Sequence, residues 1–222
     1  MNKKKLPLDF YRREDVLAIS RELLGKVLFT NLDDGRKEGP ITTAGVIIET
    51  EAYRAPEDKA SHAYNDRRTK RTEVMFAAGG VSYVYLCYGI HSLFNVVTGP
   101  KDTAHAVLVR AIHPIIGIEH MLKRRNQNTL KSNLTSGPGV LSNALGINTF
   151  HNSTDLTGAD IWIEDHGYVI SSKDIIATPR IGIAYAKEYV DLPWRFVLKN
   201  YENISKSATY TEDSMSYKPS KV

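Results

Sequence analysis

Cysteine is nearly absent from this 222-residue chain, and so are long apolar runs. The one cysteine, Cys87, excludes an internal disulfide and a zinc site built from several thiolates, and it favours a reducing compartment. No stretch approaches the roughly 20 apolar residues of a membrane span. The basic residues near the N-terminus are followed by an apolar stretch that is too short for a signal peptide, because the sequence is polar again before residue 15. We therefore expect a cytoplasmic protein that does not enter a membrane.

The signatures of several common enzyme classes are also missing. There is no G-x-x-x-x-G-K-[ST] loop, no G-x-S-x-G elbow and no G-x-G-x-x-G after a predicted strand. Phosphoryl transfer, serine hydrolysis and dinucleotide chemistry thus lose their usual support. The histidines show no H-E-x-x-H or other zinc spacing. We expect neither a metal nor a cofactor.

Positive charge is modest overall but locally clustered. The net charge is +4 and the pI is near 9.0. One cluster lies at residues 123–125, and the other consists of Arg67, Arg68, Lys70 and Arg71. Each cluster could contact the phosphates of a nucleic acid, or it could simply form a solvated surface.

Apolar periodicity predicts a single α+β (mixed α/β) domain around an antiparallel sheet. We expect helices over residues 13–25 and 114–126, and a short helix within 134–148 that starts near Pro138 and stops at Gly146. Strands are expected over residues 27–30, 41–53, 83–87, 91–97, 104–114, 160–165 and 175–183, and residues 191–199 close the core. No linker divides residues 1–200, whereas the polar residues 201–222 predict a disordered tail.

Residues 83–97, YVYLCYGIHSLFNVV, predict a β-hairpin with Tyr88 and Gly89 at its turn. A tyrosine is unusual there, because turn tips are solvated whereas an aromatic ring gains free energy when it is covered. The ring could pack on a neighbouring loop. Alternatively, something outside the chain covers it.

The strand at 41–53 ends with two carboxylates and a tyrosine on one face. A period of two places Ile47, Glu49, Glu51 and Tyr53 together. The glutamates could form ion pairs at a sheet edge, or they could line a cleft in which one of them holds a water as general base. His62 follows a loop that could return it to this cleft, although a histidine in a loop more often has a structural role or is simply solvated.

These residues together resemble the alkyladenine (3-methyladenine) DNA glycosylase family. The resemblance covers about residues 8–200 and is carried by ETEAYRAPEDKASHAY, RTEVMF, YVYLCYGIHSLFNVV, AVLVRA, LTSGPGVLSNALGI and PWRF. It implies one glycosylase domain over residues 1–200, with a curved antiparallel sheet, surrounding helices and a protruding hairpin that enters double-stranded DNA. The implied activity is base-excision repair: alkylated or deaminated purines are flipped out and released without a metal or a cofactor. Such a protein would be nucleoid-associated in a bacterium, and one wedge per lesion predicts a monomer.

The resemblance also implies roles for individual residues. Tyr53 and Tyr85 match the tyrosines that stack on the flipped base, and His62 matches the histidine that closes the pocket. Asn95 matches the residue that excludes the amino group of normal guanine. Tyr83 is expected to give hydrophobic support. A cationic alkylated purine suits such electron-rich faces, which contribute about 0.5–2 kcal/mol per contact.

Catalysis and DNA distortion are assigned in the same way. Glu51 matches the carboxylate that activates water, Arg110 an arginine beside it, and Tyr88 the intercalating tyrosine. Glu49 is expected to play a supporting role. The resemblance gives Arg67, Arg68, Lys70 and Arg71 to the DNA backbone.

Two departures from the family pattern lie on the expected DNA surface. Ile90 stands where methionine is usual, and residues 69–72 lack the usual proline. Two other functions stay open: a damaged-DNA-binding protein without catalysis, and an unrelated nucleoside or carbohydrate hydrolase that uses Glu49 and Glu51. The second alternative leaves Tyr88 unexplained.

Overall fold

The computed structural model describes residues 4–33, 35, 39–199 and 201. Its strands are β1 (Lys4–Lys5), β2 (Val27–Leu32), β3 (Ile41–Tyr53), β4 (Ser82–Cys87), β5 (His91–Thr98), β6 (His105–Ile116), β7 (Ile161–Asp165), β8 (Ile175–Thr178) and β9 (Arg195–Leu198). The α-helices are α1 (Leu8–Tyr11), α2 (Val16–Glu22), α3 (Ile118–Arg124) and α4 (Pro138–Leu145). Short 3-10 helices cover Tyr64–Asp66, Glu73–Phe76, Thr149–His151, Ser172–Asp174 and Ala184–Tyr189.

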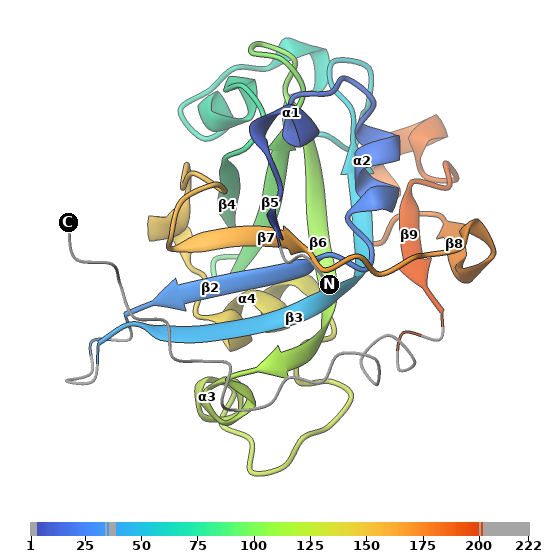
Figure 1. The fold of residues 1–222 in the computed structure, drawn as a ribbon. Coiled ribbons are helices and arrows are strands. Elements are labelled where there is room, and N and C mark those ends of the chain that lie inside the picture. The colour runs from blue at the N-terminus through green and yellow to red at the C-terminus, as the bar shows by residue number, and fades with distance from the viewer. Residues whose placement is uncertain (1–3, 34, 36–38, 200, 202–222) are drawn as a thin grey trace.

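All strands of the described chain join one curved antiparallel sheet (Figure 1). The order along it is β1-β7-β2-β3-β6-β5-β4, and β9 pairs with both β3 and β8. Strand β3 pairs with different strands along its length. Its first half pairs with β2, and residues 49–51 near its end pair with β9. The expected α+β class and single domain are confirmed. The tail expected at 201–222 lies, from residue 202 onward, outside the described residues.

Helix α4 packs inside the curve of the sheet. It contacts β5 and β6, and the carbonyl of its last residue, Leu145, accepts a hydrogen bond from the Thr30 hydroxyl of β2 at 3.0 Å. The predicted start and end of this helix are confirmed: Pro138 lies in its first turn, and Gly146 ends it with a φ of 77°. Its buried side chains join the main core with those of α2, β2, β3, β5 and β6.

Two predicted element boundaries are wrong. The helix expected at 114–126 starts only at Ile118, because β6 continues to Ile116 and Gly117 turns the chain at φ 68°. A Cβ at Gly117 would lie 2.6 Å from the Thr42 carbonyl oxygen, so the turn requires glycine. The strand expected at 175–183 ends at Thr178, before Pro179. Proline donates no hydrogen bond to a ladder, and the chain leaves the sheet there.

Irregular pairing interrupts the predicted alternation on β3. The register against β6 shifts between Ile47 and Glu49 and again between Glu49 and Thr50. The second shift leaves Arg110 without a partner between Val109 and Ala111. Bulges of this kind re-aim side chains. The predicted alternation of side chains therefore breaks between Ile47, which is buried in the main core, and Glu49, which contacts Arg110.

Candidate nucleic-acid interface and active site

A cavity of about 380 Å³ opens where the ends of β3, β4, β5 and β6 meet the start of α4. Segments 60–62 and 181–185 complete its wall. The predicted site residues come together here: its lining includes Tyr53, His62, Tyr85, Tyr88, Asn95 and Arg110. These predicted residues, which are up to 57 positions apart in the chain, thus line one hollow whose size suits a purine base.

Two carboxylates and two arginines meet beneath this cavity, where Arg110 forms the floor. Arg110 Nε donates to Glu49 Oε1 at 2.9 Å, and Arg110 Nη1 lies 3.3 Å from Glu51 Oε1. Arg195 of β9 donates to the same Glu49 oxygen at 2.8 Å. Burial alone would lower the pKa of Arg110, but Glu51 and Glu49 outweigh it and the pKa is raised. The guanidinium therefore stays charged beside the two carboxylates.

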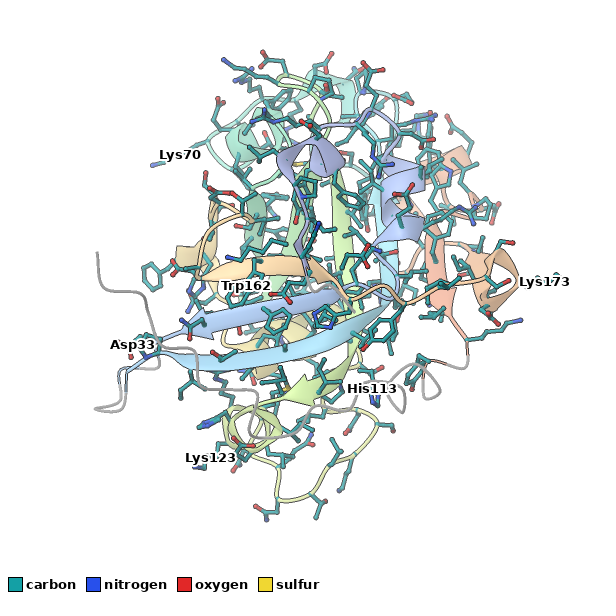
Figure 2. All side chains as sticks on the ribbon, viewed as in Figure 1. Asp33, Lys70, His113, Lys123, Trp162 and Lys173 are labelled. Carbon is teal, nitrogen blue, oxygen red and sulfur yellow. The ribbon has the colours of Figure 1, made fainter. Side chains whose placement is uncertain are left out.

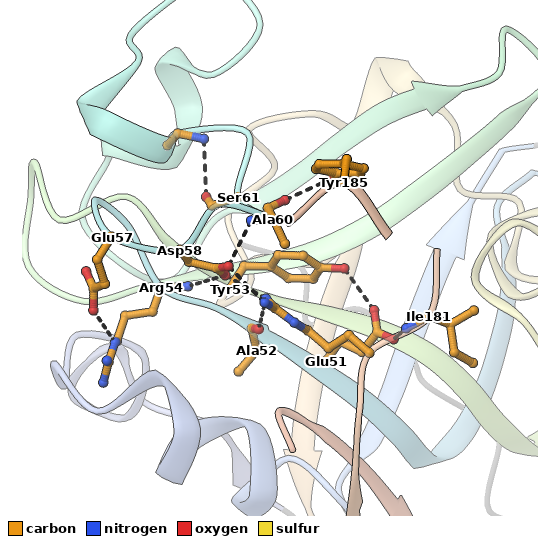
Figure 3. Close-up of polar contacts among 12 residues, drawn as sticks. Glu51, Ala52, Tyr53, Arg54, Glu57, Asp58, Ala60, Ser61, Ile181 and Tyr185 are labelled. Atoms are coloured by element: carbon orange, nitrogen blue, oxygen red, sulfur yellow. Dashed lines mark hydrogen bonds and ion pairs between the residues drawn. The ribbon is translucent and has the colours of Figure 1, made fainter. Parts of the chain in front are cut away.

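Glu51 itself is enclosed. Its side chain is 0% exposed and does not line the cavity, and both oxygens are occupied. The Tyr53 hydroxyl donates to Oε2 at 2.9 Å, and the Ile181 backbone N–H donates to Oε1 at 2.8 Å (Figure 3). Burial, followed by the charge of Glu51, raises the pKa of Tyr53 well above its ordinary value. The phenol therefore remains protonated and able to donate.

The segment around Ile181 is the part of the site that the sequence misses. Residues 179–183 (PRIGI) alternate apolar residues with an arginine and a glycine as a strand would, and no motif marks them. In the structure they run past Glu51, and residues 181–183 and 185 line the cavity. Their backbone, rather than a side chain, satisfies the carboxylate. A backbone donor leaves no signal in a residue pattern.

Aromatic rings form one wall of the cavity. His62 lies edge-on to Tyr85, with ring centroids 4.7 Å apart at 78°, and Tyr83 stacks on Tyr85 at 5.3 Å. The Tyr83 hydroxyl lies 2.8 Å from His62 Nδ1. Tyr83 is thus buried support, as expected, but it also fixes the histidine. Burial, then the charges of Arg71 and Arg67, lowers the pKa of His62 to about 4. The imidazole is neutral near pH 7.

Asn95 lies on β5 with its side chain buried against the hairpin. Its Nδ2 donates to the Tyr83 carbonyl at 3.0 Å, and the residue is only 4% exposed. The hydrogen bond holds the amide in one orientation on the cavity wall. Such a fixed side chain limits the shape of any base that enters.

The hairpin of β4 and β5 carries an exposed apolar tip. Tyr88 is 90% exposed and Ile90 is 72% exposed. Tyr88 and Gly89 adopt positive φ angles of 51° and 74°, and the Ile90 N–H donates to the Cys87 carbonyl at 3.2 Å. Within the described chain no loop covers the Tyr88 ring, so the packing alternative is wrong. The ring stands at the mouth of the cavity, which it helps to line.

The basic residues near the cavity divide into two kinds. Arg67 and Arg71 line a second hollow of about 340 Å³ that shares His62 with the first. Arg68 instead turns to two carboxylates, with contacts of 2.7 Å to Glu73 and 2.7 Å to Asp102.

The two basic clusters lie far apart in the molecule. Lys70 points outward at one end, whereas Lys123 lies on α3 at the opposite end (Figure 2). The cluster at residues 123–125 is therefore distant from the loop at residues 67–72 that holds Lys70. In the described chain no three His, Cys, Asp or Glu side chains gather as metal ligands would, and no helix there is long and apolar enough to cross a bilayer.

Comparison with known proteins agrees with this site. A model of the methylpurine-DNA glycosylase family matches residues 9–202. A Chlamydia felis protein named "putative 3-methyladenine DNA glycosylase" is 51% identical over 203 residues, which cover 91% of this chain and 98% of that protein. A Bacillus mycoides protein of the same name is 44% identical over 208 residues, covering 90% of this chain and 98% of its own length. The match spans β2 to β9 and every residue of the cavity floor and aromatic wall, and the chain belongs to the methylpurine-DNA glycosylase family.

Proposed function

We propose that this chain is a DNA glycosylase that flips damaged purines out of duplex DNA and hydrolyses their N-glycosidic bond. The substrates are alkylated and deaminated purines: 3-methyladenine, 7-methylguanine, hypoxanthine and ethenoadenine. The observation that carries the proposal is the cavity, which combines aromatic faces, an arginine floor paired with two carboxylates beneath it, and an exposed tyrosine at its mouth. The enzyme acts as a cytoplasmic monomer and leaves an abasic site.

Recognition starts with DNA distortion at the hairpin tip. The Tyr88 ring enters the duplex and fills the gap left by the flipped nucleotide, which suits an aromatic side chain that is 90% exposed in the free protein. The extruded base enters between Tyr53 on one side and His62 and Tyr85 on the other. Neutral His62 adds no repulsion to a cationic base. Asn95, held by Tyr83, excludes the amino group of guanine.

The chemistry is hydrolysis with Glu51 as general base. Water attacks the anomeric carbon from the face opposite the base, its proton passes to Glu51, and the electron pair of the C–N bond leaves with the base. A cationic alkylpurine leaves as a neutral molecule, whereas hypoxanthine must be protonated first. The charged Arg110 lies beside Glu51, and the Glu51 carboxylate offsets positive charge on the sugar. Because the Glu51 side chain is 0% exposed in the free protein, a water reaches it only after the groups that surround it move.

The enclosure of Glu51 also supports a second function, namely a protein that binds damaged DNA without releasing the base. Single-turnover base release separates the two. The substrate is a duplex with one hypoxanthine or one ethenoadenine, and the variants are Glu51→Gln and Glu49→Gln. Both glutamates contact Arg110, so Glu49→Gln is a matched control.

We expect Glu51→Gln to lower the release rate by about 10²–10⁴-fold, the usual range for a general base, while lesion binding persists. Glu49→Gln should cost about ten-fold or less, because Arg110 keeps its contact with Glu51. Equal losses in the two variants would contradict the role of Glu51. Tight binding by the native protein without any release would establish the binding function instead.

A further inference from the structure

Asp58 and Arg180 form a completely buried ion pair beneath the cavity. Arg180 Nη1 donates to Asp58 Oδ2 at 2.6 Å and Nη2 donates to Oδ1 at 2.8 Å, and both side chains are 0% exposed. Arg180 also donates to the Ala52 carbonyl at 2.9 Å. Removing one member of such a pair is costly, whereas replacing both can be nearly neutral. The pair thus needs a reason beyond stability.

Asp58 holds the loop that leads to His62. It accepts from the backbone N–H of Ala60 at 2.9 Å and of Arg54 at 3.3 Å (Figure 3). These donors support the carboxylate independently of Arg180. The pair therefore connects the end of β3, the loop at 54–62 and the segment at 179–183, all of which contribute to the cavity wall.

The guanidinium of Arg180 lies against the ring of Tyr53. Its Cζ is 4.7 Å from the Tyr53 ring centroid and 5.0 Å from that of Trp194. Tyr53 lines the cavity, whereas Arg180 is buried behind it. A base that stacks on Tyr53 thus has the cation on the far side of the same ring.

This placement creates an electrostatic problem for cationic substrates. A base stacked about 3.5 Å from the ring would lie roughly 8 Å from the guanidinium. An unneutralised cation at that distance would weaken binding of a cationic base by about 30-fold at an effective dielectric of about 20, and a neutral base would be almost unaffected. Asp58 cancels that charge.

We propose that Asp58 is a specificity-determining residue: by neutralising Arg180 behind Tyr53, it lets the stacking ring accept cationic alkylated purines as well as neutral ones. Arg180 is a positioning residue, because its guanidinium backs the Tyr53 ring. The inference rests on the proposed function and adds to it a division between cationic and neutral bases.

The test compares release of 7-methylguanine, which is cationic in DNA, with release of hypoxanthine, which is neutral. The protein variants are Asp58→Asn, Arg180→Met and the double variant. Single-turnover release rates and lesion affinities are measured for each base. Because hypoxanthine is protonated before it leaves, the ratio that is compared with the native chain is the ratio of the affinities for the cationic and the neutral base. Circular dichroism and thermal unfolding report the fold.

We expect Asp58→Asn to lower this ratio about ten-fold, somewhat less than the Coulomb value because water at the cavity mouth screens the charge. Arg180→Met leaves the Asp58 carboxylate and should raise the ratio. The double variant carries neither charge and should restore the native ratio within about three-fold, even if it is slower on both bases. Should Asp58→Asn fail to fold, the rise with Arg180→Met and the restored ratio in the double variant still decide the matter.

A purely structural pair would change both bases by the same factor in every variant, and that result would overturn the inference. Thr43→Val is the matched structural control, because it removes a buried hydroxyl contact of 2.7 Å to Thr30 about 30 Å away along β3. It should lower the unfolding temperature and leave the ratio unchanged. A native chain that releases neither base would refute the proposed function itself, an outcome distinct from an unchanged ratio.

Discussion

Arg67 and Arg68 are neighbours in sequence. We predict that, of these two arginines, only Arg67 contributes to the salt dependence of DNA binding. Arg67 is exposed and lines the second hollow next to Arg71. Arg68 donates three hydrogen bonds to two carboxylates. Its Nε and Nη2 donate to Glu73 at 2.9 Å and 2.7 Å, and its Nη1 donates to Asp102 at 2.7 Å. A phosphate could reach Arg68 only in competition with these groups.

The size of the effect follows from counterion release. Each phosphate contact contributes about 0.9 to the slope of log K against log salt, so one contact weakens binding about 3.5-fold between about 50 mM and about 200 mM salt. Arg67→Ala should therefore make the slope shallower by about one, and its deficit in affinity should shrink as salt increases.

The control removes Arg68 without changing the net charge. The double variant Arg68→Gln, Glu73→Gln removes one positive and one negative charge, so the net charge of this loop stays the same. Fluorescence anisotropy with an undamaged duplex across this salt range measures the slopes. We expect the double variant to keep the native slope. A loss of one unit in the double variant, or none in Arg67→Ala, would refute the assignment.

Two further predictions concern residues of the cavity and the hairpin. The pKa of His62 is about 4 in the folded state against 6.5 for a free histidine, so the unfolded chain binds the extra proton as pH falls from 6.5 toward 4. The free energy of unfolding should drop by about 2 kcal/mol between pH 7 and pH 5 from this residue, and His62→Gln should remove that part of the pH dependence in urea titrations. Tyr88→Ala should leave the unfolding free energy within about 0.5 kcal/mol of native, because the ring is 90% exposed, yet weaken lesion-duplex binding about ten-fold. A marked loss of stability with unchanged binding would show that the ring has a structural role.

Local patterns predicted the parts of the site that lie on single elements. Glu49, Glu51 and Tyr53 follow one strand, and their shared face needed only the strand period, as their joint contacts show. The pairing of β4 with β5 was also predicted from the sequence, because the apolar alternation and the turn of this hairpin lie within one short stretch. Periodicity works here because the residues that must coincide are two positions apart.

Partners that are distant in the chain were invisible to the same reasoning. Asp58 and Arg180 are 122 positions apart. Asp58 lies in the block at residues 49–64 that carries the resemblance but received no role there, and Arg180 belongs to no block. Arg110 entered the predicted site only through the family resemblance, since a bulge rather than a strand period aims it at the glutamates. The Ile181 backbone donor depends on a chain path after Pro179 that a run of apolar residues does not specify.

The backbone of Tyr88 has a consequence for engineering this protein. A φ of 51° strains a side chain with a Cβ by about 1–2 kcal/mol, and glycine, which has none, relieves this strain. Since the ring makes so little contact with the rest of the fold, a thermostability screen would enrich Tyr88→Gly and register only a gain. Sequence optimisation guided by melting temperature would thus erase the hairpin's aromatic tip first, and such libraries need a DNA-based selection at this one codon.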